Sequence, residues 1–240
     1  MAKLTWDNPS ERLFETGVSR GVLYVQNFDG SYADGVAWNG LVSVTDKHTG
    51  GDPVHLYAGG QPYVNIYDFE EFEATIEAYT YPDEFMECEG FYSDAASEDA
   101  LIVSLQDRKR FGFCYTSIIG NDIEGTDYHY RIHIFYDCVA APSEKEFQTI
   151  NDSSEITTFS WDITTYPVDI SGYDQSPMVT IDSRKTTRTT MRKIERQLFG
   201  TVDDPPRLID AREIVSFLGS HYLLTDDFDN IVIGGDRILV

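Results

Sequence analysis

Two histidines, His129 and His133, have the spacing that most directly suggests a metal site. On a helix, side chains four residues apart share a face and can bind one ion. The surrounding sequence, YHYRIHIFYDCV over 128–139, is instead rich in aromatic and β-branched residues, which predicts a strand. Four residues of strand span roughly 13 Å, too far for one ion. We therefore expect two members of a polar strand face and no metal.

Other residues that could support chemistry favour a structural interpretation. The segment 121–127 (NDIEGTD) carries several oxygens around a glycine but lacks the order of a calcium loop, so a plain turn is expected. Cys114 lies in an apolar stretch, where a buried, inert thiol is more common than a nucleophile. With 41 acidic residues, no particular pair stands out for glycoside hydrolysis. The sequence has no phosphate loop, hydrolase elbow or HExxH zinc motif, so we expect no enzyme activity and no cofactor.

The elements that must position these residues are mostly strands. Alternation is clearest over 71–81, where Phe72, Ala74, Ile76 and Ala78 face one way and the glutamates face the other. Apolar residues at helical spacing, followed by Gly200 and Gly219, predict two late helices over 187–199 and 210–218. Further strands are predicted over 54–57, 63–69, 110–118, 128–139, 155–166 and 178–182, with a turn at 58–62, a connection at 120–127 and a polar loop over 45–53.

These elements predict a mainly β fold. The simplest arrangement is a single β-sandwich or barrel-like domain over 1–219, with one or two short α-helices near the C-terminus. Residues 220–240 form a C-terminal extension, where Gly-Gly and Gly-Asp between apolar runs suggest a β-hairpin.

Charge is distributed unevenly along the chain. The 240 residues include 18 Lys and Arg against 41 Asp and Glu, a formal net charge of −23. The stretch 48–107 contains no Lys or Arg, whereas 184–196 holds six bases and only one acid. Such an acidic chain should repel nucleic acid and anionic membranes. The two segments are either solvated faces or surfaces of opposite sign through which copies associate.

Several other features bear on the cellular compartment. No apolar run approaches the roughly 20 residues of a membrane span, and the first residues lack the apolar stretch of a secretory signal. The three cysteines, Cys88, Cys114 and Cys138, are odd in number and widely spaced. They fit buried free thiols in a reducing cytosol better than a disulfide framework.

Five segments, taken in order, resemble a known family. They are 4–24 (LTWDNPSERLFETGVSRGVLY), 35–46 (GVAWNGLVSVTD), 72–85 (FEATIEAYTYPDEF), 108–128 (RKRFGFCYTSIIGNDIEGTDY) and 140–168 (AAPSEKEFQTINDSSEITTFSWDITTYPV). They resemble the major tail proteins, the tail-tube subunits, of long-tailed non-contractile bacteriophages, especially those of actinobacterial hosts. The likeness runs to about Leu218. Residues 89–100 are more irregular than the family pattern, and 220–240 have no counterpart in it.

The resemblance implies a structural virion protein that assembles into hexameric rings, which stack into a hollow tail tube for DNA ejection. Its partners would be other copies of itself, a tape-measure protein and tail-end proteins, with DNA passing through the lumen without specific binding. It would reside in the virion tail after assembly in the host cytoplasm, with no membrane partner. The alternatives are a single-ring tail completion or terminator protein of similar fold, and a β-sandwich domain that binds or cleaves glycans.

Within this hypothesis, three sets of residues receive roles. Acidic side chains on the alternating strand are expected to line the lumen, with an outer solvated face as the alternative. A Gly-containing loop is expected to reach the next ring, and a basic helix face is expected to contact a neighbouring subunit or to remain solvated. The lumen set is Glu71, Glu73 and Glu77; the loop set is Asp46, Lys47, His48, Thr49, Gly50 and Gly51; the contact set is Arg188, Arg192, Lys193 and Arg196.

Overall fold

A computed structural model describes residues 4–49, 53–67, 71–93, 101–143, 145–146, 156–218, 224–225, 231–233 and 236–238. Its main feature is one eight-stranded antiparallel sheet, which confirms the predicted mainly β class. The strands of this sheet are β1 (Leu13–Val25), β2 (Val36–Trp38), β3 (Leu41–Thr49), β6 (Glu71–Ala78), β9 (Phe111–Asn121), β10 (Gly125–Ala140), β11 (Phe159–Thr165) and β12 (Met178–Asp182).

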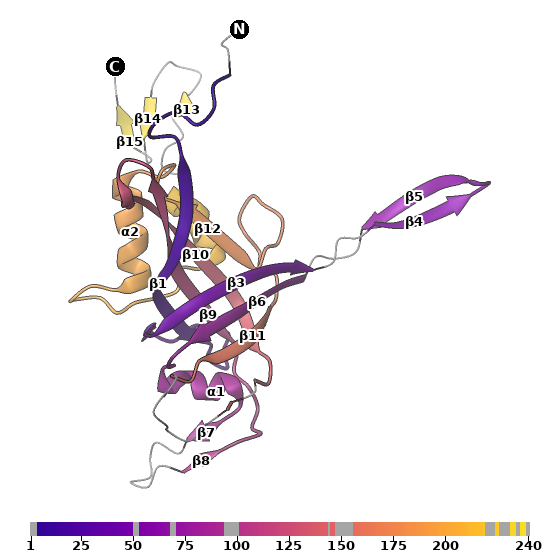
Figure 1. The fold of residues 1–240 in the computed structure, drawn as a ribbon, viewed down its shortest axis with the longest axis vertical. Coiled ribbons are helices and arrows are strands. Elements are labelled where there is room, and N and C mark those ends of the chain that lie inside the picture. The colour runs from indigo at the N-terminus through magenta and orange to yellow at the C-terminus, as the bar shows by residue number, and fades with distance from the viewer. Residues whose placement is uncertain are drawn as a thin grey trace.

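The sheet forks at its longest strand. Its order is β2-β1-β9-β10-β11-β6-β3, and β12 also pairs with β10. Along one edge of β10, residues 131–135 pair with β12 and residues 138–140 pair with β11. Because two strands leave the same edge at different heights, the sheet splits into two layers. In Figure 1, β3, β6 and β11 cross in front of β1, β9 and β10.

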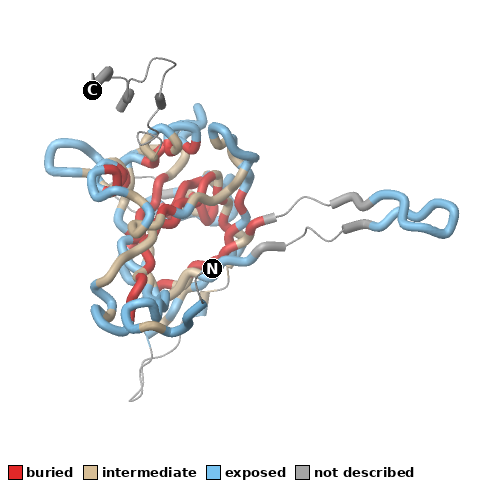
Figure 2. Tube along the Cα trace, turned by 90° about the horizontal axis from the view of Figure 1, so that it is seen from above, coloured by how far each residue is buried: buried red, intermediate tan, exposed pale blue. Residues whose placement is uncertain are grey.

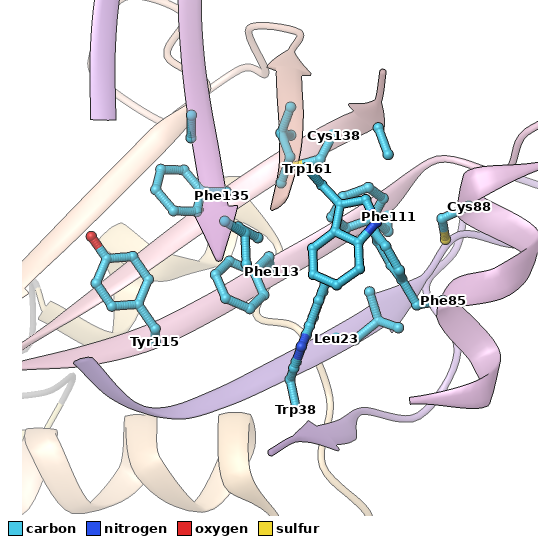
Figure 3. Close-up of a cluster of buried hydrophobic side chains, with 14 of the residues drawn as sticks. Leu23, Trp38, Phe85, Cys88, Phe111, Phe113, Tyr115, Phe135, Cys138 and Trp161 are labelled. Atoms are coloured by element: carbon cyan, nitrogen blue, oxygen red, sulfur yellow. The ribbon is translucent and has the colours of Figure 1, made fainter. Parts of the chain in front are cut away.

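The first hydrophobic core lies between these layers (Figure 3). β9 contributes Phe113 and Tyr115, and β11 contributes Trp161 from the opposite layer. The Trp161 ring lies edge-on to Trp38 at 5.5 Å and to Phe85 at 5.3 Å between centroids. Edge-to-face contacts at this distance are favourable beyond the area they bury. An aromatic cluster therefore holds the two layers together.

The second core lies on the other face of β1, β9 and β10. Two helices cover that face: α2 (Arg188–Phe199) and α3 (Ala211–Leu218). Thr187 caps α2 by accepting from the amide of Thr190, and the buried residues of α2 include Ile194 and Leu198. The hydroxyl of Tyr24 on β1 donates to the carbonyl of Leu198 at 2.6 Å, which ties helix to sheet. β9 is thus buried on both faces along nearly its whole length, whereas residues 13–20 of β1 and 125–131 of β10 are exposed or partly exposed.

Four smaller groups of elements accompany the large sheet, and one of them, η1 with α1, contributes Phe85 and Cys88 to the first core. A hairpin of β4 (Pro53–Ala58) and β5 (Gln61–Tyr67) projects far from the sheet, and β7 (Tyr92–Ser93) pairs with β8 (Ile102–Val103) at the opposite end from the N-terminus (Figure 1). The turn η1 (Asp83–Phe85) leads into the short helix α1 (Met86–Glu89). Near the C-terminus, β13 (Leu224–Thr225), β14 (Ile231–Ile233) and β15 (Asp236–Ile238) form a small antiparallel sheet.

Most predicted elements are present, with different limits. Both late helices form where predicted, and β14 and β15 pair as the expected terminal hairpin. The predicted connection over 120–127 shortens to a tight turn, because β9 continues to Asn121 and β10 starts at Gly125. The polar loop predicted over 45–53 was wrong for 45–49. Those residues extend β3 and pair in register with β6 from Thr45↔Thr75 to Thr49↔Glu71.

A buried ion pair between Glu89 and Lys145 connects α1 to the segment that follows β10. Glu89 at the end of α1 accepts from the indole nitrogen of Trp161 at 2.5 Å and from the Lys145 ammonium at 2.7 Å. The same ammonium lies over the Tyr81 and Phe91 rings, at 4.4 and 5.0 Å from their centroids. A buried carboxylate costs free energy unless its oxygens are bonded, and here each oxygen has a donor.

We predict that Trp161→Phe lowers the free energy of unfolding by about 2–3 kcal/mol, because it removes a buried donor of Glu89 and part of the aromatic cluster. The matched control is Trp6→Phe, since Trp6 is 76% exposed and should change stability by less than about 0.5 kcal/mol. Guanidinium denaturation followed by circular dichroism measures both. Equal losses in the two variants would contradict the assignment.

Candidate functional surfaces

The layer made of β3, β6 and β11 has a polar outer face. Its inner face packs into the first core through residues such as Ile76 and Trp161. The register then turns every intervening residue outward, away from that core. These outward residues are Ser43, Thr45 and Lys47 on β3, Glu73, Thr75 and Glu77 on β6, and Ser160, Asp162 and Thr164 on β11.

Cross-strand bonds order this polar face. Ser43 donates to Glu77 at 2.7 Å, and Thr75 donates to Asp162 at 2.8 Å. The Lys47 ammonium lies 3.5 Å from a Glu73 carboxylate oxygen. The face therefore presents three carboxylates and one ammonium among hydroxyls. Such a surface repels polyanions and has little apolar area on which apolar molecules can pack.

Two of the three residues predicted for the lumen, Glu73 and Glu77, share this face. Glu71 belongs to the same strand, but its side chain lies outside the described residues. The residues predicted for the lumen included none from β3 or β11. The alternation of polar and apolar residues in FSWDITT (159–165) was the signal available for β11.

The residues predicted for the inter-ring loop are divided by the structure. Asp46–Thr49 are strand residues of β3, and Gly50 and Gly51 lie outside the described residues. The projecting element is instead the β4–β5 hairpin, which we call the arm (residues 53–67). The arm contains no Asp, Glu, Lys or Arg, although the chain carries a net charge of −23. Tyr57 and Tyr63 near its tip are 67% and 78% exposed, and Figure 2 shows the tip fully in the exposed colour.

The basic residues of α2 all point away from the core. Arg188, Arg192, Lys193 and Arg196 are exposed, while the apolar stripe of the helix is buried. Within the described residues, no ion pair or side-chain hydrogen bond is made by these four or by Lys185. The other described Lys and Arg side chains each bond or pair with an acid or a carbonyl. Four of the five unpaired cations of the described chain therefore lie on α2, and the fifth, Lys185, lies three residues before it.

A shallow hollow of about 600 Å³ runs beside this helix. Arg20 lines it, pairs with Glu195 at 2.8 Å and stacks on the Phe199 ring at 3.9 Å. Arg192 and Arg196 line the same hollow without such partners. Arg20 is thus held by partners within the fold, whereas Arg192 and Arg196 remain available to bind an anion.

The two histidines bond to different hydroxyl groups. His129 Nδ1 lies 2.9 Å from Ser183 Oγ, and His133 Nε2 lies 2.8 Å from Ser117 Oγ. Burial lowers the pKa of His133, against the nearby Glu15 carboxylate, which raises it. Among the described residues no group of three His, Cys, Asp or Glu side chains could hold a metal ion. The interpretation of these histidines as members of a polar strand face fits this geometry.

The remaining candidates also have structural roles. Asn121 Oδ1 accepts from the amides of Ile123 and Glu124, which makes 121–124 a bonded turn, as predicted. The three cysteines are buried and free, and burial raises the pKa of Cys88 and Cys114 to about 12. Thiols with such pKa values remain protonated and unreactive at neutral pH. No helix in the described part of the chain has the length and apolarity to cross a bilayer.

Comparisons with known proteins give similarities only at the level of solved structures. No protein-family model matches the chain, and no curated protein is significantly similar to it. One similar structure is a sheath–tube complex of an extracellular contractile injection system, PVC, in the extended state, with 12% identity and a TM-score of 0.37 over 68% of this chain and 88% of that chain.

Two further structures are similar. The baseplate of the anti-feeding prophage matches with 6% identity and a TM-score of 0.34, over 68% of this chain and 93% of that chain. The PVC sheath/tube terminator in the extended state matches with 9% identity and a TM-score of 0.34, over 75% of this chain and 99% of that chain.

The free and fixed bases beside α2 should differ in their effect on stability. We predict that Arg20→Ala lowers the free energy of unfolding by about 1 kcal/mol, because it removes an ion pair and a cation–π contact. Arg196→Ala should change it by less than about 0.5 kcal/mol. Urea denaturation of both variants tests this. A loss in Arg196→Ala as large as that in Arg20→Ala would show that Arg196 has a partner within the subunit.

Proposed function

We propose that this chain is a self-assembling structural subunit of a phage tail tube, in which stacked hexameric rings form the conduit for DNA ejection. The observation that carries the proposal is the polar, net acidic outer face of β3, β6 and β11. The first core lies behind this face, and no helix among the described residues packs on it. The ordered likeness of five sequence segments to major tail proteins supports the same function.

In the proposed tube, this face lines the lumen. Each copy contributes Glu73, Glu77 and Asp162, with Glu71 on the same strand. Repetition around a ring turns a modest local charge into bands of like charge along the path of the DNA. Repulsion of phosphates acts over a Debye length of roughly 8 Å at physiological salt. DNA would then slide past the wall without adhering to it.

The arm serves as the stacking element of the proposal. An isolated two-stranded hairpin is marginally stable in water, so the arm gains order when another surface covers it. Its exposed Tyr57 and Tyr63 supply contact area, and its lack of charge avoids repulsion between acidic copies. The entropy cost of ordering it would help keep subunits monomeric until assembly starts.

The remaining assignments follow from the same proposal. The body, within 1–219, forms the tube domain, and 220–240 is a C-terminal extension. Tape-measure and tail-end proteins would meet the tube, which assembles in the host cytoplasm and resides in the virion tail. No step in this function requires catalysis or a cofactor.

Negative-stain microscopy of the concentrated, purified protein tests the proposed function directly. Long tubes of uniform width support a tube subunit. Isolated rings that never stack would indicate a terminator-like protein. Monomers at every concentration would contradict self-assembly and favour a binding domain.

Removal of the arm should separate folding from stacking. Because Asp46–Thr49 belong to β3, the deletion must leave β3 intact and replace only 53–67 by Gly-Gly. We predict an unfolding free energy within about 1 kcal/mol of the parent, because the arm lies outside both cores, together with loss of tubes in the microscope. Normal tubes from the armless chain would exclude the arm as the stacking element.

Charge reversal in the lumen should affect DNA passage and leave assembly intact. We predict that phage particles built with Glu71→Lys, Glu73→Lys and Glu77→Lys contain normal tails but eject their genome slowly or incompletely, because cations would hold the phosphates. The control replaces the same residues by Gln, which removes repulsion without creating attraction. Unchanged ejection kinetics in the Lys variant would place this face away from the DNA.

A further inference from the structure

The unpaired bases of α2 are available to an external partner. The chain is rich in acids, and in the described part nearly every other base has found a partner. Arg188, Arg192, Lys193 and Arg196 nevertheless all lie exposed on one helix face, without any. A concentrated cationic face attracts an anionic surface, and the net charge of −23 makes another copy of this chain an anionic partner.

A second surface of the same chain carries acceptor oxygens that lack hydrogen-bond donors. A pocket of about 460 Å³ opens between the end of β10, the 168–169 segment and the start of α3. Tyr136 and Asp137 line it, and each has a buried side-chain oxygen without any hydrogen-bond partner among the described residues: Tyr136 Oη and Asp137 Oδ1. Tyr136 itself is only 2% exposed. Burying an oxygen without a hydrogen-bond partner costs free energy, and a bound donor would remove that cost.

The chemistry of the pocket selects the kind of donor. A carboxylate oxygen can only accept, so the group that satisfies Asp137 must carry N–H or O–H bonds. Only Oδ1 of Asp137 lacks a donor, because Oδ2 pairs with Arg110 at 2.5 Å. Two further carboxylates line the pocket, Asp169 and Asp210, together with Arg207 and Arg212, and all four residues are exposed. Asp169 is engaged only by exposed partners, Arg212 at 3.4 Å and Gln175 at 2.7 Å, which an incoming cation can replace. A guanidinium group fits because it is planar, charged and rich in N–H donors.

We infer that the basic face of α2 on one copy docks against this pocket on the next copy, with a guanidinium group from α2 entering between Asp169 and Asp210. The contact joins two different patches, so it is heterologous and propagates from copy to copy until a ring closes. The inference rests on the proposed function, because it assigns the lateral contact within that assembly.

A charge-exchange experiment tests the contact. Variant one carries Arg192→Glu and Arg196→Glu; variant two carries Asp169→Arg. Each alone places like charges across the interface, so each should raise the protein concentration at which assembly begins by at least roughly tenfold. When the two are mixed in equal amounts, every contact can pair opposite charges if the copies alternate. Mixing should therefore restore assembly, as followed by light scattering and microscopy.

Controls keep the result specific. Asp174→Arg makes the same charge change at an exposed residue that does not line the pocket. It should assemble like the parent and should fail to rescue variant one. Parent-like assembly of variant one, or two defective variants that stay defective when mixed, overturns the inference. A parent that never assembles overturns the proposed function instead, so the two failures are distinguishable.

A second variant does not depend on charge. Tyr136→Phe removes the hydroxyl that lacks a partner, so it should raise the unfolding midpoint of the free subunit by about 2–4 °C while weakening assembly several-fold. The matched control is Tyr24→Phe, whose hydroxyl is already bonded to the Leu198 carbonyl and whose loss should lower the midpoint. A lower midpoint for Tyr136→Phe, or unchanged assembly, contradicts the assigned role of the pocket.

Discussion

Burial of β9 on both faces, together with residues 21–24 of β1 and 132–136 of β10, is the constraint on which the rest of this structure depends. One face meets the aromatic cluster around Trp161, and the other meets α2 and α3. A strand buried on both faces does not alternate between apolar and polar residues, and β9 accordingly reads FGFCY over 111–115. Gly112 belongs to the same constraint, since a Cβ there would lie 2.4 Å from a Leu208 methyl group. These buried segments are the frame of the molecule, and within 111–121 only Ile118 is partly exposed.

The surfaces available for contact with other molecules therefore lie on the elements around this frame. The outer layer of β3, β6 and β11 needs only one buried face, and its other face is polar. The helices bury one stripe each, which leaves the basic side of α2 outside. No side chain of the arm that the structure describes belongs to either core. The molecule thus has three surfaces of different character around the same frame: the acidic outer face of β3, β6 and β11, the basic face of α2 and the uncharged arm.

The sequence predicted those parts of this arrangement that local patterns determine. The alternation over 71–78 identified both faces of β6, and helical spacing with a following glycine identified α2. Local composition failed at 45–49, because TDKHT is polar and adjoins glycines, whereas pairing with β6 supplies the hydrogen bonds that hold it extended. The pocket could not be predicted, because Tyr136, Asp169 and Asp210 meet only through the packing of β10 against α3.

The distribution of ion pairs connects the fold to the proposed assembly. Fixed bases such as Arg131 and Lys145 neutralise carboxylates within the body and join strands or segments far apart in sequence. In a chain with 41 acids and 18 bases, every base used internally leaves fewer for contacts between copies. Concentrating the unpaired bases on α2 preserves one attractive patch on a subunit whose overall charge opposes association. Assembly driven by that patch would be directional, because it joins the basic face of one copy to a different, acidic patch of the next.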